Sequence, residues 1–301
     1  MEKNILIIYY SQSGQMREIQ ENLVSNIDAN IYWAEIKPVN PFPFPWNSRA
    51  FFDAMPESVK LIPSEIETLD IDTSINYDLV ILGFPIWFLS PAIPFTSFLK
   101  SPQAKNILNN KPVITVIGSR NMWIAAQEDV KKMLIDVNAN LVGNIVLRDR
   151  TQNLISVVTI VHWLFSGLKT KYKGIFPKPG VSDKDIKESV RFGANITDCL
   201  LKNDFTNLQL ALLKKGAVDY LIDIASMELK AKRIFNIWAN IIHTKEKNNK
   251  RDKWVTIFKY YLFAVIILLS PIVSILVYLT YPLFFPFIVR KKRYYTSCRL
   301  K

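Results

Sequence analysis

The sequence predicts an α/β protein with a doubly wound, parallel, five-stranded sheet, followed by a helical, membrane-associated segment. Short apolar runs at 5–10, 79–84 and 113–118 are bounded by polar or turn residues, as strands buried on both faces of a parallel sheet are. Stretches of helical length separate these runs. Residues 260–289 then form a run of thirty uncharged residues, which is too long and too apolar for the surface of a soluble domain.

The predicted elements alternate along the first two thirds of the chain. Strands are expected at 5–10, 30–36, 79–84, 113–118 and 139–147, and helices at about 15–27, 92–100, 122–137 and 183–203. In an open sheet of this kind the ligand crevice lies at the carboxyl ends of the strands. Three loops leave those ends, at 11–15, 84–91 and 119–123, and these loops are the candidates for a binding site.

The first loop is a candidate phosphate-binding turn. It contains Ser11, Gln12, Ser13, Gly14, Gln15 and Met16. A phosphate group requires hydroxyl donors, a backbone that no Cβ obstructs, and N–H groups at the positive end of a helix dipole. Serine and glycine are also ordinary residues of a capped turn that binds no ligand, so this stretch alone leaves both interpretations open.

The second loop carries a more specific signal. Pro85 follows a strand exit, and Ile86, Trp87 and Phe88 then form a turn before a helix that starts with proline. Exposed turns usually lack three large apolar residues in a row. A flat aromatic ligand, stacked on Trp87 or packed under Phe88, explains them. The alternative is that they pack against the long segment 38–65.

The third loop contains Ser119, Arg120, Asn121 and Trp123. The Arg120 guanidinium could bind a phosphate, a carbonyl oxygen or the anionic edge of a reduced ring, and Asn121 could donate a hydrogen bond to the ring edge. An arginine at a helix start is also commonly a solvated surface residue. The neighbouring Trp123 favours a role in the site.

Taken in order, YYSQSGQ (9–15), GFPIWF (83–88) and GSRNMW (118–123) resemble the loops of the flavodoxin-like flavoproteins. The resemblance covers about residues 1–203. It implies that the cofactor is FMN, with its phosphate in the first loop and its isoalloxazine between the other two. The residues it implies for the cofactor are Ser11, Gln12, Ser13, Gly14, Gln15, Met16, Pro85, Ile86, Trp87, Phe88, Ser119, Arg120, Asn121 and Trp123. The sequence departs from the common pattern T/S-x-T-G-x-T, because Met16 replaces the last hydroxyl.

A closer resemblance is carried by segments 118–131, 141–167 and 172–186. These are similar to the bacterial dialkylresorcinol condensing enzyme family, a flavodoxin-like partner of a ketosynthase. The resemblance implies oxidation of an alkylated cyclohexane-1,3-dione to an aromatic dialkylresorcinol, with FMN taking the hydride. It also implies a lipid-like, alkylated substrate and a ketosynthase as a protein partner; a homodimer is left open.

The candidate catalytic residues are Arg120 and His162, with Tyr9 and Tyr10 considered beside them for the proton transfer. His162 lies in the uncharged stretch 154–168, where a lone histidine is more often a hydrogen-bonded core group. That stretch is too short to span a membrane, which takes ~20 residues. It is expected to be a core helix, an interfacial helix, or the wall of an apolar tunnel that covers the flavin.

The composition excludes several classes of site. Cys199 and Cys298 are far apart, and with only His162 and His243 as imidazoles neither a disulfide framework nor a metal site is expected. No secretory signal is recognisable, so the globular part is expected in the cytoplasm. The net charge is −3 over residues 1–150 and +15 over residues 151–301. Nucleic acid is not expected as the partner, because the basic clusters bracket apolar residues.

The chain is expected to divide into three parts. These are an α/β domain at 1–205 with an insertion at 150–180, an amphipathic helical region at 206–253, and a hydrophobic anchor with a basic tail at 254–301. Within the second part, residues 218–243 have the spacing of an amphipathic helix that lies on a membrane or on the α/β domain.

Residues 258–289 are expected to anchor the chain at the cytoplasmic face of the bacterial inner membrane, in contact with anionic headgroups. Basic clusters at 245–253 and 290–293 flank the apolar run. A re-entrant hairpin keeps both clusters in the cytoplasm, as the positive-inside rule favours, whereas a single crossing does not. Pro271, Pro282 and Pro286 also interrupt the run, so a hairpin is the preferred prediction.

Three functions are consistent with these observations. The first is a membrane-associated, FMN-dependent oxidoreductase of the aromatase type. The second is an NAD(P)H-dependent quinone reductase. The third is a non-catalytic flavodoxin-like module that docks a ketosynthase, for which the proline-rich and aromatic segment 40–52 is a candidate partner surface or a wall of the site.

Overall fold

The computed structural model describes residues 2–246 and 250–299. Its centre is a parallel sheet of β1 (Asn4–Tyr9), β2 (Asn30–Glu35), β3 (Leu79–Trp87), β5 (Pro112–Ser119) and β6 (Asn140–Arg148). The strand order is β2-β1-β3-β5-β6, and the two-residue strand β4 (Ser90–Pro91) pairs antiparallel with the end of β3. The predicted doubly wound sheet of five parallel strands is therefore confirmed.

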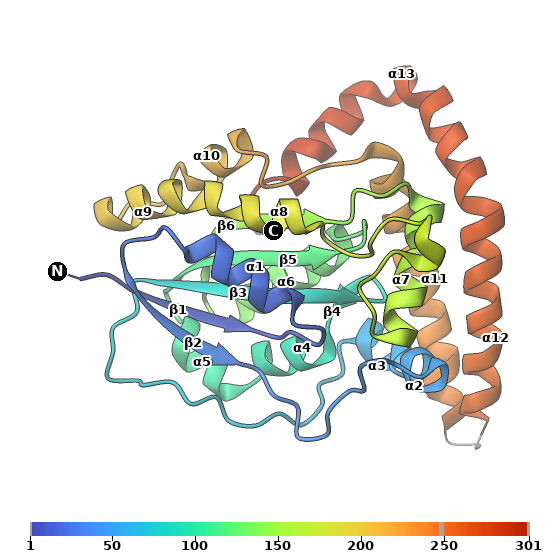
Figure 1. Cartoon of the computed structure of the whole chain (residues 1–301), viewed down its shortest axis with the longest axis horizontal. Coiled ribbons are helices and arrows are strands. Elements are labelled where there is room, and N and C mark those ends of the chain that lie inside the picture. Colours follow the sequence, from blue (N-terminus) through green and yellow to red (C-terminus); the bar gives the residue numbers. More distant parts are fainter. Residues whose placement is uncertain (1, 247–249, 300–301) are drawn as a thin grey trace.

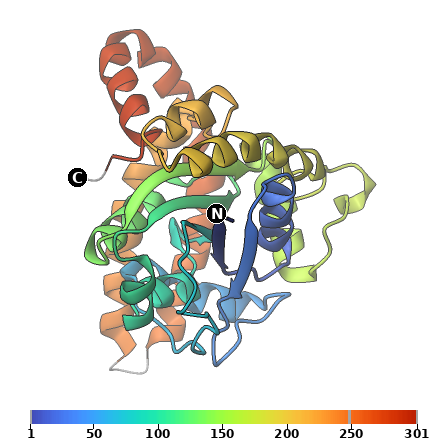
Figure 2. The same cartoon turned by 90° about the vertical axis from the view of Figure 1, so that its left-hand side faces the viewer.

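Helices cover both faces of the sheet (Figure 2). One face is covered by α1 (Gln15–Val24), α8 (Asp183–Lys187), η2 (Glu188–Phe192), α9 (Gly193–Lys202) and α10 (Leu208–Lys214), and the other by α4 (Ile93–Leu99), α5 (Pro102–Leu108) and α6 (Ile124–Asp136). The helix expected at 183–203 is thus broken by a 3₁₀ turn. Central strand residues such as Ile5, Ile7 and Ile81 are fully buried, and each stabilises the fold by about 1.5–3 kcal/mol.

Two insertions lie at the end of the sheet where the strands finish. The segment after β2 forms α2 (Ser48–Asp53) and α3 (Met55–Lys60), and the segment after β6 forms α7 (Asn153–Ser166) and the 3₁₀ turn η1 (Tyr172–Gly174). The Asn47 side chain caps α2 by accepting a hydrogen bond from the Ala50 N–H at 2.7 Å. Both insertions therefore reach the edge of the sheet at which the three loops emerge (Figure 1).

The C-terminal part is helical throughout. It consists of α11 (Ile222–Glu246), α12 (Arg251–Ala264), a π-helical turn η3 (Val265–Leu269) and α13 (Ser270–Tyr295). The helix expected at 218–243 is observed as α11. Of the predicted basic cluster 245–253, residues 247–249 lie outside the described residues, as do 300 and 301 in the predicted tail.

The run from α12 to α13 is the only helix in the described ranges that is long and apolar enough to cross a membrane. Pro282 and Pro286 do not end it but lie inside α13, and Figure 1 shows α13 bending over at its top and descending toward α10. Prolines within an apolar run predict either a break or a kink, and here Pro282 and Pro286 lie within a continuous helix that bends. Proline removes a main-chain hydrogen bond and kinks a helix, which accounts for such a bend.

Candidate functional site

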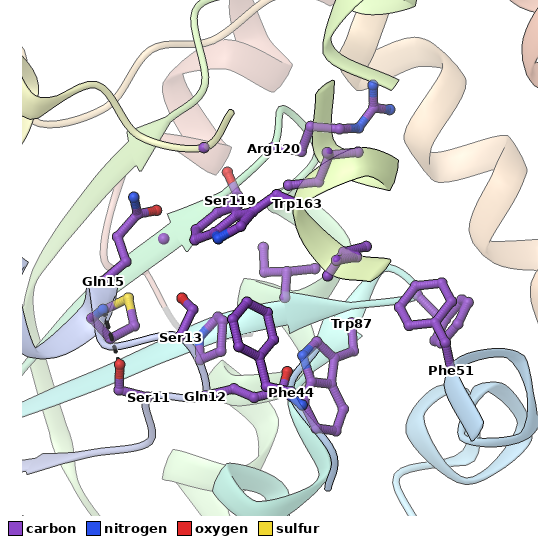
Figure 3. A pocket seen from close by; sticks show the side chains of 18 residues that line it. Ser11, Gln12, Ser13, Gln15, Phe44, Phe51, Trp87, Ser119, Arg120 and Trp163 are labelled. Carbon is purple, nitrogen blue, oxygen red and sulfur yellow. Dashed lines mark hydrogen bonds between the residues drawn. The ribbon is translucent and has the colours of Figure 1, made fainter. Parts of the chain in front are cut away.

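A pocket of about 250 Å³ lies at the carboxyl ends of β1, β3 and β5 (Figure 3). It is lined by Ser11, Gln12, Ser13, Gln15 and Met16 from the first loop, by Pro85, Ile86, Trp87 and Phe88 from the second, by Gly118, Ser119 and Arg120 from the third, and by Phe44, Phe51, Ile160, Trp163, Leu164 and Gly180 from the insertions. The structure therefore brings the three predicted loops together at one site.

The first loop has the backbone of an anion-binding turn. Gly14 has a φ of 83°, in the left-handed region that favours glycine, and it is followed directly by the first residue of α1. The Ser11 hydroxyl accepts a hydrogen bond from the Met16 N–H at 3.2 Å. The N–H groups of Ser13 and Gly14 donate no hydrogen bond within the described part of the chain. These donors at a helix N-terminus suit a phosphate.

Gln15 and Met16 fix this turn to neighbouring segments. The Gln15 side chain donates to the Val181 carbonyl and accepts from the Val181 N–H, both at 3.2 Å. A Cβ on Gly118 would lie 2.7 Å from the Met16 sulfur, so a larger residue at position 118 would displace the Met16 side chain. Met16 lacks the hydroxyl of the common pattern, and its side chain instead packs the first loop against the third.

Aromatic residues form the second side of the pocket. The buried Trp87 ring is held edge-to-face by the rings of Tyr10, Phe42 and Trp46, at centroid distances of 5.8, 5.0 and 5.3 Å. Trp46 also donates from Nε1 to Gln12 Oε1 at 3.0 Å, which ties the aromatic cluster to the first loop. Trp87 is thus a fixed wall, as a preformed ring-binding site requires.

The turn after Trp87 is strained. Phe88 and Leu89 both have positive φ values, 47° and 61°, which bulky residues rarely adopt. The conformation places the Phe88 ring against Phe51, at a centroid distance of 4.7 Å, and both rings line the pocket. Strain of this kind is often found at ligand sites, and here it positions an aromatic side chain.

The third loop contributes one hydroxyl and one charge. The Ser119 Oγ atom is buried and has no hydrogen-bond partner among the described residues. Arg120 Nη1 donates to the Asn153 carbonyl, Asn153 Oδ1 and Ser156 Oγ at 3.1, 3.0 and 2.9 Å, so its guanidinium is joined to α7. Burial lowers the pKa of Arg120 to about 10, and Asp149 opposes that shift; the guanidinium remains protonated at neutral pH.

Two of the predicted residues of the third loop do not line this pocket. Asn121 donates from Nδ2 to Asn153 Oδ1 at 2.7 Å and faces a neighbouring cavity. Trp123 is buried in the core beside α6. The carboxylate of the fully buried Glu228 accepts the N–H groups of Trp123 and Ala125, so Glu228 holds the end of this loop from α11.

The structure does not bring His162 to the pocket. Its ring packs against Tyr172 at a centroid distance of 4.7 Å, and His162 is not among the residues that line the pocket. Gly14 is not among the lining residues either, although its neighbours Ser13 and Gln15 are. The predicted roles of His162 and Arg120 in catalysis stay predictions. Of these two residues, Arg120 lines the pocket and His162 does not.

The insertions supply residues that the three-loop prediction left out. In Figure 3 the Trp163 ring extends from α7 over the loop that carries Ser13, toward Gln15. A Cβ on Gly180, whose φ is 78°, would lie 2.6 Å from that ring, so glycine permits Trp163 its position. Phe44 and Phe51 come from segment 40–52, which is therefore a wall of the site. The high density of aromatic and proline residues in segment 40–52 is the sequence feature that indicates this wall.

These features fit a cofactor that joins a phosphate to a flat ring, as FMN does. The free N–H groups and hydroxyls of the first loop suit the phosphate, and the aromatic wall suits the ring. The buried Ser119 hydroxyl lacks a partner, and a ring edge would supply one. The lining contains no Asp, Glu or His among the described residues, so no negative charge opposes an anionic ligand.

Comparisons with known proteins agree with this geometry. The flavodoxin family model matches residues 4–157. Similar solved structures include an FMN complex of a Lactobacillus acidophilus flavoprotein, with 26% identity, coverage of 48% of this chain and 93% of that one, and a TM-score of 0.41. Another is a Bacteroides eggerthii flavoprotein, with 20% identity, coverage of 55% and 99%, and a TM-score of 0.39. No curated protein matches the chain. Since the family match covers just over half of the residues, the chain belongs to the flavodoxin family, and FMN is its cofactor.

Proposed function

We propose that the protein is a membrane-associated, FMN-dependent oxidoreductase that aromatises an alkylated cyclohexane-1,3-dione to a dialkylresorcinol. One observation carries the proposal: the aromatic wall of the FMN pocket is continuous with the C-terminal helices. Phe51 and Phe88 line the pocket and belong to the same apolar cluster as Phe235 of α11 and Phe258 of α12. A lipid-like substrate can therefore reach the ring-binding site without leaving apolar surroundings.

The pocket residues suit oxidation of a dione. Bound FMN supplies a hydride acceptor at N5. Aromatisation removes one hydride from a ring carbon and one proton from the neighbouring carbon, so the ring loses two hydrogens in all. A cyclic 1,3-dione is acidic and loses its C2 proton to water, so the substrate is largely the enolate. Loss of the hydride from the enolate leaves a neutral dienone, and the resorcinol forms when the proton of the neighbouring carbon moves to a ring oxygen, so no strong base is needed. A lining without Asp, Glu or His among the described residues is consistent with such a substrate.

The chain's own residues have defined tasks in this reaction. Arg120 is positively charged at neutral pH and lines the pocket, so it stabilises the negative enolate oxygen. Trp87, Phe51 and Trp163 exclude water and hold the ring flat. The Ser119 hydroxyl is free to donate a hydrogen bond at the ring edge.

The C-terminal helix is proposed to be a re-entrant membrane anchor. Both of its ends are bound to the same globular domain: Arg251 pairs with Asp53 and Glu57 at 2.6 and 2.8 Å, and the Tyr294 hydroxyl donates to Glu128 at 2.7 Å. A helix that crossed a bilayer once would place these ends on opposite sides. The fastening of both ends supports entry and exit on the cytoplasmic side.

The bend and the exposed residues of α13 support the same proposal. Leu279 is 72% exposed and Leu283 is 80% exposed, and none of the most apolar part of the run is buried inside the protein. An apolar surface of this extent is stable when lipid covers it. Pro282 and Pro286 lie where a chain that turns back inside the membrane would need to bend.

The reaction is tested by mixing the detergent-purified, FMN-loaded protein with a dialkylated cyclohexane-1,3-dione in the absence of oxygen. We expect loss of the oxidised flavin absorbance and formation of one resorcinol per FMN, identified by mass spectrometry. A flavin that stays oxidised contradicts the aromatase proposal. Oxidation of NADPH by a quinone under the same conditions, without reaction of the dione, would instead assign the protein to the quinone reductases.

A further inference from the structure

A second cavity, of about 390 Å³, lies beside the FMN pocket. It is enclosed by α11, by the C-terminal run from α12 to α13, and by the loop that carries Phe88; Figure 1 shows α11 and α12 side by side at this end of the molecule. Its lining is almost entirely aliphatic and aromatic. Among the described residues that line it, the charged side chains are Arg120 and Lys230.

The two cavities share a wall. Phe51, Ile86, Phe88 and Arg120 line both of them. Phe88 is held in this wall by the strained turn at Phe88 and Leu89, whose φ values are positive. A molecule with a ring in the FMN pocket therefore has an apolar space directly behind these side chains, with the Arg120 guanidinium at the boundary between the polar and the apolar part.

The outer wall of the second cavity belongs to the membrane-anchoring run. Val265, Ile266 and Leu269 of the π-helical turn line the cavity. Ile267 and Leu268 of the same turn point away and are 58% and 64% exposed. A π turn widens a helix locally and is frequent at functional sites. One face of the helix thus encloses the cavity, while the opposite face is available to lipid.

We propose that this second cavity binds an alkyl chain of the substrate, and that the chain enters from the bilayer between α11 and the C-terminal run. The inference rests on the proposed function, which places the reacting ring in the FMN pocket, and it adds the site that selects the substrate by its chain. Four polar residues are among the described residues that line it: Arg120, Asn121, Lys230 and Ser270. Arg120 and Asn121 donate hydrogen bonds to Asn153, and Ser270 accepts one from it, so of these four Lys230 is left for a polar tail. The occupant is therefore a saturated or weakly unsaturated hydrocarbon chain.

The size of the effect follows from hydrophobic transfer. Each methylene group buried in the cavity strengthens binding by a factor of up to about four relative to water. Part of this gain is absent for a substrate that partitions into the bilayer, because lipid tails are as apolar as the cavity. The comparison must therefore be made between protein variants in the same membrane, with one ligand at a time.

The test uses the FMN-loaded protein in nanodiscs and two probes, 5-methylresorcinol and 5-nonylresorcinol, whose binding is followed through the visible absorption of FMN. Val273→Trp fills the cavity, because Val273 lines it. Ile272→Trp is the matched control, since Ile272 is adjacent in the same helix, is 54% exposed and does not line the cavity. Retention of FMN shows that each variant is folded.

We expect V273W to weaken binding of the nonyl compound at least about tenfold relative to both wild type and I272W, with no change for the methyl compound. Equal affinities of V273W and I272W for the nonyl compound would overturn the proposal. If V273W loses FMN, Ala231→Leu on the α11 side of the cavity replaces it. The affinities of A231L for the nonyl and the methyl compound are then interpreted in the same way. A protein that oxidises no dione but shows the V273W effect would contradict the proposed function and leave the chain site standing.

Discussion

At the scale of single residues, the pocket is built from side chains at the ends of neighbouring strands, which the parallel sheet brings to one edge. Ser11 and Ser13 follow β1, Arg120 follows β5, and Trp87 is the last residue of β3. These parallel strands end at a common edge of the sheet. Trp163 could not be placed in this way. Its contact with the first loop depends on how the insertion after β6 folds back, which no local pattern encodes.

Ser13 provides the first prediction at this scale. Ser13→Leu places a bulky side chain in the turn where the free N–H groups meet the phosphate, so the FMN dissociation constant should rise by about 100-fold, or ~3 kcal/mol. Ser25→Leu at the other end of α1 is the control and should leave FMN binding unchanged. Fluorescence titration of the apoprotein with FMN measures both, and an unchanged affinity of S13L would show that the loop is only a turn.

Glu228 provides the second prediction. Burial raises the pKa of this carboxyl to about 7, although the N–H groups of Trp123 and Ala125 lower it in part. The folded state therefore holds the proton more tightly than the unfolded state, and the free energy of unfolding falls as the pH rises from about 4.5 to about 7.

The measurement compares wild type with Glu228→Gln, which cannot titrate, by unfolding in detergent at about pH 5 and about pH 8. Wild type should lose about 2–3 kcal/mol relative to E228Q between the two conditions. If the difference in unfolding free energy between wild type and E228Q is the same at both pH values, the raised pKa of Glu228 is contradicted.

At the scale of elements, the structure narrows the three roles that the sequence of α7 left open: core helix, interfacial helix, or wall of an apolar tunnel over the flavin. It is not a core helix, because Ile160, Trp163 and Leu164 line the pocket while Ile155 and Val158 are exposed. A wall of the site and an interfacial helix remain, and the two roles can be combined in one helix. Its apolar residues occur on both faces, so hydrophobic periodicity could not show which face is buried. Three hydrogen bonds from Arg120 then fix its position over the site.

This arrangement predicts that α7 retains the cofactor. Trp163→Ala removes a ring that is 8% exposed and covers the first loop, so FMN should dissociate about 10- to 100-fold faster, equivalent to ~1.4–3 kcal/mol. Trp238→Ala is the control, because Trp238 packs with Trp254 and Tyr261 away from the pocket. Stopped-flow release of FMN measures the rate, and equal rates for the two variants would show that α7 does not cover the cofactor.

At the scale of the whole molecule, the sequence predicted the sheet, the order of its strands along the chain and the apolar C-terminal run. It did not predict that both ends of this run return to the α/β domain. Arg251 binds Asp53 and Glu57, and Tyr294 binds Glu128, across more than 160 residues of sequence in each case. Such pairings are set by tertiary structure, and the charges alone do not identify their partners.

These contacts predict the outcome of a labelling test of the proposed re-entrant topology. In a protein without its native cysteines, Lys250→Cys and Arg299→Cys place a thiol on exposed positions at the two ends of the run. Both should react with a membrane-impermeant maleimide only after the cytoplasmic side is opened, because both ends are fastened to one domain. Labelling of either cysteine from the outside in intact cells would show that the run crosses the membrane once.

The proposal that FMN in this protein oxidises a substrate held in the membrane is tested most directly in vesicles. The protein is reconstituted with FMN into vesicles, and reduction of the flavin by a dialkylated cyclohexane-1,3-dione is followed without oxygen, with the dione either in the same bilayer or in separate vesicles. Rapid reduction and resorcinol formation are expected when protein and dione share a bilayer, and much slower reduction when they do not. A flavin that remains oxidised in both arrangements would contradict this proposal.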